Sequence, residues 1–110
     1  MDHLFVYGSL SPGQPNEHIL SKIGGTFQEA TVIGVLYEEG WGAEIGFPGI
    51  IIDSAGELVR GYVFSSVNLN ENWELLDAFE GKEYHRKLTT ATLKNGNEQS
   101  VYIYELVRKT

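Results

Sequence analysis

Apolar residues recur along this chain in short alternating or continuous runs, and this pattern predicts a domain built mainly from β-strands. The expected strands are rich in β-branched and aromatic residues and are bounded by turn-forming residues: Leu4–Tyr7, Thr26–Tyr37, Ile50–Ile52, Leu58–Ser65, Tyr84–Leu93 and Ser100–Leu106. The stretch that begins at Thr26 is either one long strand or two strands joined by a bend at Gly34. We expect the Ile50 and Leu58 strands to pair as a hairpin around a turn at residues 53–56.

Two stretches have the features of helices. In the first, Asn16 is placed to cap one or two turns that run to Ile23, and the pair Gly24-Gly25 would end them in the left-handed conformation. In the second, Asn68–Glu71 has the spacing of a capping box and opens the main helix, which stops at Gly81. The sequence therefore predicts one short and one main helix.

Turns and loops occupy the rest of the chain. The Asn95-Gly96 pair favours a type I′ turn between the last two strands. Two prolines and a glycine make Ser11–Asn16 a loop, and Glu38–Gly49 is a longer loop, rich in glycine and aromatic residues, of a kind that often borders a binding site. About five to seven strands with two helices predict a single α+β domain over residues 1–110, a small mixed β-barrel with the helices at its side.

The composition of the 110 residues narrows the class of function. A formal net charge of −7 argues against nucleic acid as a partner, because phosphate backbones are bound by an excess of Lys and Arg. The absence of cysteine excludes thiol catalysis and disulfides. No apolar run approaches the length of a membrane span and no signal-peptide pattern is present, so we expect no membrane partner and a cytoplasmic location.

The first candidate for chemistry is the carboxylate of Glu80, in the last turn of the main helix. Glu80 follows Leu76 by four positions and Trp73 by seven, so it lies on the same helix face as residues that are expected in the core. Burial disfavours the charged form of a carboxylate and moves its pKa toward values that suit proton transfer at neutral pH. The alternative is a solvated glutamate at the rim of the helix.

The turn after the first strand is the second candidate. Gly8 allows a sharp turn that leaves consecutive N–H groups unpaired, and such a concave backbone suits an anion, although the turn could also be an ordinary one. Ser9 lacks the Gly-x-Ser-x-Gly frame of a hydrolase nucleophile, and no phosphate-binding glycine motif follows the strand. The histidines lack the spacing of a metal site, so we expect no metal.

Strand alternation gives further candidates near the C-terminus. It places Tyr84 and Arg86 on one face, where they could line one wall of a pocket or act only in packing. Tyr102 and Tyr104 likewise share one face of the last strand. For Asp77, in the preceding helix, we expect a hydrogen bond to the backbone or to Arg86.

Several short motifs occur together in one order along the chain. They are Phe5–Leu10, the Pro-Gly loop that ends at Asn16, Phe47–Gly49, Leu76–Gly81 and Tyr84-x-Arg86. In this order the motifs resemble the gamma-glutamylcyclotransferase-like family, which includes the gamma-glutamylamine cyclotransferases and the plant avirulence-induced proteins. The resemblance covers nearly the whole chain and implies a small β-barrel flanked by helices, in which the first loop and the motif glutamate meet in one pocket.

The resemblance also implies roles for individual residues. Glu80 matches the family's catalytic acid and base. Four consecutive residues match the loop that binds the α-carboxylate of the substrate: Tyr7, Gly8, Ser9 and Leu10. Tyr84 and Arg86 match residues of the pocket or of its support. The region 38–46 departs from the family pattern, and a leaving-group pocket could lie there.

The implied reaction converts a γ-glutamyl amine or related amide to 5-oxoproline and a free amine, with Glu80 as base and then acid. Because the α-amine of the substrate is itself the nucleophile, we expect no cofactor, and the expected partner is a small-molecule γ-glutamyl substrate. Two alternatives stay open. One is a non-catalytic protein of the same fold that binds a small carboxylate metabolite, and the other is a different acyl-amine reaction at the same site.

Overall fold

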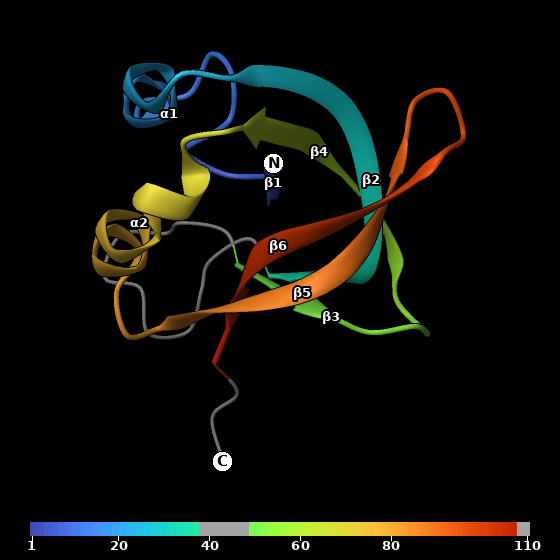
Figure 1. The fold of residues 1–110 in the computed structure, drawn as a ribbon. Coiled ribbons are helices and arrows are strands. Elements are labelled where there is room, and N and C mark those ends of the chain that lie inside the picture. Colours follow the sequence, from blue (N-terminus) through green and yellow to red (C-terminus); the bar gives the residue numbers. More distant parts are fainter. Residues whose placement is uncertain (38–48, 108–110) are drawn as a thin grey trace.

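The computed structural model describes residues 1–37 and 49–107, in which six strands and two short helices are present. The strands are β1 (Asp2–Val6), β2 (Thr26–Tyr37), β3 (Gly49–Ile52), β4 (Glu57–Ser66), β5 (Tyr84–Leu93) and β6 (Glu98–Leu106). The helices are α1 (Glu17–Ile23) and α2 (Trp73–Glu80), and a single 3-10 turn, η1 (Leu69–Glu71), precedes α2. Figure 1 shows the strands curving around one another, with both helices on the same side of them.

Strand pairing closes the sheet into a barrel. Neighbouring strands follow the order β1–β4–β2–β3–β6, and β6 returns to β1 through a parallel pairing of Phe5 with Ile103. β5 is an extra strand that pairs with β6 along most of its length and with β2 at Ala30 and Leu93. The predicted α+β class and mixed barrel are therefore confirmed. With seven and eight residues, neither of the described helices is long or apolar enough to cross a membrane.

Alternation along the strands divides the buried residues into two clusters. One fills the barrel: Phe5, Ala30, Val32, Ile50, Val59, Val63, Ala91, Val101 and Ile103. The other lies between the barrel and the helices: Leu4, Val6, Leu10, Leu20, Phe64, Leu69, Trp73, Leu76 and Tyr104. β1 contributes to both clusters because its side chains alternate between the two faces. The loop that begins at Gly8 therefore leaves a strand that is buried on both faces.

The predicted hairpin between residues 50–52 and 58–65 is wrong. β3 and β4 lie on opposite edges of β2, because Gly34 of β2 is opposite Ile52 on one edge and Glu57 on the other. The intervening turn crosses β2, where a Cβ on Gly56 would overlap the carbonyl group of Gly34. Two glycines thus allow the chain to change edges, and β2 continues through Gly34 as one strand.

The two predicted asparagine caps do not form. The side-chain amide of Asn16 donates to Oγ of Ser9 at 3.0 Å, and that of Asn68 donates to the carbonyl oxygen of Ile23 at 2.9 Å. Both asparagines therefore bind groups outside their own helix start. The residues of the expected capping box form η1, and α2 begins only at Trp73.

Glycines in the left-handed region end both helices and shape the last hairpin. Gly24 after α1 has φ of 85° and Gly81 after α2 has φ of 84°, as predicted. The hairpin turn differs from the prediction, since a type I′ turn needs positive φ at two central residues and only Gly96 has it, at 91°. Hydrogen bonds from Gly96 N to Leu93 O and from Leu93 N to Asn97 O fit a type I turn with a glycine bulge, because three residues separate the paired positions.

Candidate active site

Glu80 occupies the last position of α2, where the helix meets the barrel. Leu76, one turn earlier, is fully buried, and Trp73 is 8% exposed, so the face that carries Glu80 is the face that packs on the sheet. The left-handed conformation of Gly81 then turns the chain away at once. Burial raises the pKa of Glu80 from 4.5 to about 7. The prediction of a partly buried carboxylate with a raised pKa is confirmed.

Three tyrosines approach Glu80 from three different strands or strand ends. Burial raises the pKa of Tyr7, Tyr84 and Tyr104, and the negative charge of Glu80 raises each of these values further. Tyr7 follows β1, Tyr84 begins β5 and Tyr104 lies in β6. The charge of Glu80, in the fourth motif, thus acts on Tyr7 of the first motif, about seventy residues earlier in the chain.

The hydroxyl of Tyr7 is used inside the barrel. It donates to the carbonyl oxygen of Tyr104 at 2.7 Å and accepts from the N–H of Ile50 at 3.2 Å. The phenol therefore connects the end of β1 to its neighbour β6 and, beyond β6, to β3. This side chain fixes the position of the loop that follows, and only the backbone of Tyr7 remains for a ligand.

The loop after Tyr7 forms a compact turn. Ser11 N donates to Gly8 O at 3.0 Å, and Asn16 N donates to Ser9 O at 2.9 Å. Leu10 is 5% exposed and packs in the cluster beneath the helices, so its side chain anchors the turn. Within the described residues, the N–H groups of Gly8, Ser9 and Leu10 donate to no other group. These donors fit the predicted anion-binding turn, and its role in binding a carboxylate stays a prediction.

A surface hollow of about 450 Å³ borders this loop on the side of β4. Its lining includes Tyr7, Gly8 and Ser9 together with Arg60 and Tyr62, but not Glu80. The charge of Glu80 acts on Tyr84 of β5 and Tyr104 of β6, which are also absent from the lining of this hollow. This hollow does not join Glu80 to the loop, so the single pocket implied by the resemblance stays a prediction. The leaving-group pocket expected at residues 38–46 lies outside the described residues.

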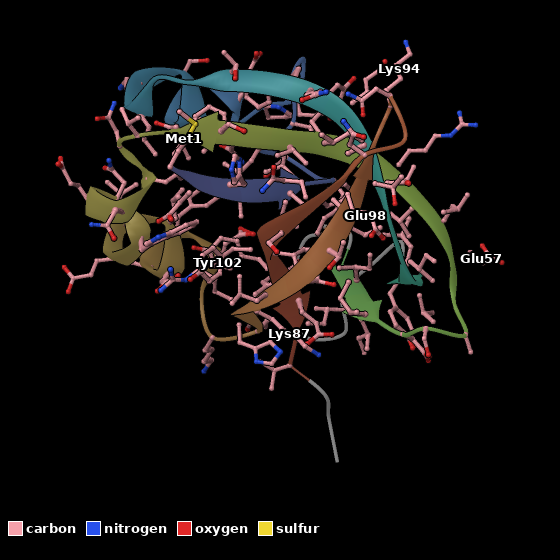
Figure 2. All side chains as sticks on the ribbon, turned by 45° about the vertical axis from the view of Figure 1, so that its right-hand side comes forward. Met1, Glu57, Lys87, Lys94, Glu98 and Tyr102 are labelled. Atoms are coloured by element: carbon pink, nitrogen blue, oxygen red, sulfur yellow. The ribbon has the colours of Figure 1, made fainter. Side chains whose placement is uncertain are left out.

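Arg86 of β5 connects the candidate site's helix α2 with β6. Its Nε lies 3.2 Å from Oδ1 of Asp77, and its guanidinium stacks over the rings of Trp73 and Tyr102, with Cζ at 4.4 and 5.2 Å from the ring centroids. Figure 2 shows Tyr102 on the side of β6 that faces α2. The expected bond between Asp77 and Arg86 is confirmed. Because both groups are already paired, these contacts fit a supporting role for Arg86.

Two polar contacts of β6 were not predicted from the sequence. The hydroxyl of Tyr104 donates to Oδ1 of Asp77 at 2.7 Å. On the opposite face, Glu105 is 6% exposed and accepts from Ile52 N at 2.7 Å, with His85 Nε2 also at 2.7 Å. The register of β5 and β6 is the information from which both contacts could have been predicted, because it pairs Arg86 with Tyr104 and His85 with Glu105. A correct register for the last hairpin would have brought these pairs together.

Comparison with known proteins agrees with this fold. The family model described as gamma-glutamyl cyclotransferase, AIG2-like, matches residues 4–110. The chain belongs to this family. No curated protein sequence matches it significantly.

Solved structures place this AIG2-like chain among proteins of very different length. An AIG2-like protein from Mus musculus is 21% identical with a TM-score of 0.76, and the match covers 100% of this chain and 80% of the mouse chain. A protein from Arabidopsis thaliana is 27% identical with a TM-score of 0.72, covering 99% and 70%. YkqA from Bacillus subtilis is 24% identical with a TM-score of 0.72, but the match spans 96% of this chain and 35% of YkqA.

The raised pKa of Glu80 predicts how the stability of this AIG2-like domain depends on pH. The pKa of Glu80 is 4.5 in the unfolded chain and about 7 in the folded one, so the folded state favours the protonated carboxyl group. The contribution of Glu80 to the free energy of unfolding is therefore fully present below about pH 4.5 and is lost as the pH rises through 7. We expect Glu80→Gln to be more stable than wild type at about pH 8, by at most about 3 kcal/mol, and the advantage to disappear near pH 4.5.

Urea unfolding at both pH values measures this difference. Glu74→Gln is the matched control, because Glu74 is an exposed carboxylate of the same helix. Equal free energies of unfolding for wild type and Glu80→Gln at pH 8 would show that burial does not raise the pKa of Glu80.

Proposed function

We propose that this chain is an enzyme that cyclises the γ-glutamyl group of a γ-glutamyl amine or related amide to 5-oxoproline and releases the amine. The observation that carries the proposal is the Glu80 carboxylate, whose pKa burial raises to about 7 and whose charge acts on Tyr7 at the start of the Gly8 loop. Membership in the AIG2-like gamma-glutamyl cyclotransferase family supports the same class of reaction.

The reaction needs one base and one acid. The α-amine nitrogen of the substrate attacks its own γ-carbonyl carbon, a C–N bond forms, and the carbonyl oxygen becomes an oxyanion. Glu80 takes the first proton that the α-ammonium loses and gives it to the departing nitrogen as the original amide bond breaks. The second proton, which the α-nitrogen loses on ring closure, goes to the released amine, which leaves as an ammonium ion. A carboxyl group with a pKa near 7 populates both forms at neutral pH and can therefore perform both transfers.

The second requirement is a fixed substrate geometry. Ring closure is favoured when the α-amine is held against the γ-carbonyl, and an anchored α-carboxylate provides that restraint. We assign this anchor to the unpaired N–H groups of Gly8, Ser9 and Leu10, one of which could also face the oxyanion. Tyr84, beside Glu80, borders the substrate, and Arg86 supports this wall through Asp77.

A product assay tests the proposal. The chain is incubated with γ-glutamyl amines, γ-glutamyl-lysine isopeptide and γ-glutamyl dipeptides, and 5-oxoproline is measured by mass spectrometry. We expect 5-oxoproline and the free amine in equal amounts from at least one member of the panel. Calorimetric binding of 5-oxoproline or glutamate, with no product from any substrate, would instead favour a non-catalytic binding protein.

A further inference from the structure

Tyr104 makes two hydrogen bonds on opposite sides of β6. Its hydroxyl donates outward to Oδ1 of Asp77 in α2 at 2.7 Å, while its carbonyl oxygen accepts inward from the hydroxyl of Tyr7 at 2.7 Å. The side chain of Tyr104 is 3% exposed and that of Asp77 is 45% exposed, so the bond joins a buried hydroxyl to a carboxylate at the surface. A single residue therefore connects the helix to the end of β1.

The two partners of Tyr104 each lie next to a part of the candidate site. Asp77 precedes Glu80 by three residues, so it holds the same last turn of α2. Tyr7 immediately precedes the Gly8 loop. Besides Tyr104 in β6, its hydroxyl forms a hydrogen bond only with Ile50 in β3 among the described residues. The path from Glu80 to the loop thus runs through Asp77, Tyr104 and Tyr7.

We propose that Tyr104 is a positioning residue, which sets the distance between the Glu80 carboxylate and the loop of Tyr7–Leu10. The inference rests on the proposed function, because it assigns this distance to proton transfer within a bound γ-glutamyl substrate. Arg86 also holds Asp77, but its side chain is 27% exposed and it makes no described contact with Tyr7. Arg86 therefore fixes the helix to β5, and of these two residues only Tyr104 also forms a hydrogen bond with Tyr7.

Tyr102 provides a matched control for Tyr104. It lies two residues earlier on the same face of β6 and packs edge-on against Trp73, with ring centroids 5.0 Å apart. Its hydroxyl makes no hydrogen bond with any residue that the structure describes. Tyr102→Phe and Tyr104→Phe therefore remove the same atom from the same surface, and only the second change removes a bond to α2.

The test measures catalysis and the ionisation of Glu80 in the full chain. For Tyr104→Phe we expect kcat for 5-oxoproline release to fall by roughly tenfold to a hundredfold, with KM changed by less than about threefold. The pKa of Glu80, followed by NMR of its carboxyl carbon, should fall by about one unit as the loosened helix end becomes more solvated. The ionisable groups that face Glu80 from the barrel are Tyr7, Tyr84 and Tyr104, and this change leaves the first two in place.

The two measurements separate the inference from the proposed function. The NMR titration needs no substrate, so a chain without cyclotransferase activity still reports whether Tyr104 controls the surroundings of Glu80. An unchanged pKa and kcat in Tyr104→Phe, or equal changes in Tyr102→Phe, would overturn the inference. If Tyr104→Phe does not fold, Asp77→Ala removes the same bond from the helix side together with the ion pair to Arg86. Asp77→Asn is its control, because it loses the same charge and keeps an oxygen that can accept from Tyr104, and we expect the Glu80 pKa to fall further in Asp77→Ala than in Asp77→Asn.

Discussion

We expect Glu80→Gln to lower kcat for 5-oxoproline release by roughly 10²–10⁴-fold, the range typical for the loss of a general acid and base. Glutamine has nearly the same shape and retains hydrogen-bonding capacity, but it cannot accept and return a proton. Because the side chain sits at the end of α2 beside the left-handed Gly81, we expect the fold to be preserved. Steady-state rates of product formation measure the effect, and circular dichroism confirms the fold.

The exposed Glu74→Gln in the same helix is the control for Glu80→Gln. It removes one negative charge from α2 without touching the barrel, so its kcat should stay within about twofold of wild type. Equal rates for wild type and Glu80→Gln on every active substrate would contradict the role assigned to Glu80.

We expect Gly56→Ala to destabilise the fold strongly. The added Cβ would lie 2.8 Å from the Cα of Gly34 and would overlap its carbonyl group, at the point where the chain crosses from one edge of β2 to the other. Backbone atoms cannot move aside as a flexible side chain can, so we expect a loss of about 3 kcal/mol or more in the free energy of unfolding. Urea denaturation measures it.

The neighbouring residue of the same turn provides the comparison. Ala55 is exposed, so Ala55→Ser should change stability by no more than about 0.5 kcal/mol. A Gly56→Ala protein as stable as Ala55→Ser would contradict the close crossing of β2.

The local pattern of the sequence was sufficient for most elements of the fold. Alternating runs located the strands, and the glycines after Ile23 and Glu80 located the ends of both helices. The hairpin of residues 50–52 with 58–65 was wrong because a short turn between two strands normally pairs them. Here Gly34 and Gly56 allow the chain to cross β2. The crossing depends on a close contact between two segments that are distant in the sequence, so a local sequence pattern cannot predict it.

At the candidate site, too, some features follow from the local sequence pattern and others depend on tertiary contacts. Helical spacing alone put Glu80 on the buried face, and strand alternation alone put Tyr84 and Arg86 together. The use of the Tyr7 hydroxyl inside the barrel could not be predicted, because it depends on where β3 and β6 lie around β1. The same holds for Asn68, which binds the end of α1 in place of the predicted cap. Tertiary contacts decided the partner in both cases.

The dependence of kcat/KM on pH tests the central claim most directly, because it connects product formation to one ionisation. The release of 5-oxoproline is measured from about pH 5 to about pH 9 with wild type and Glu80→Gln. Since the base must be ionised, kcat/KM for wild type should fall tenfold per unit below a pKa of about 7, and this acid limb should vanish with Glu80→Gln. A flat wild-type profile, or the same acid limb in both proteins, would contradict the account.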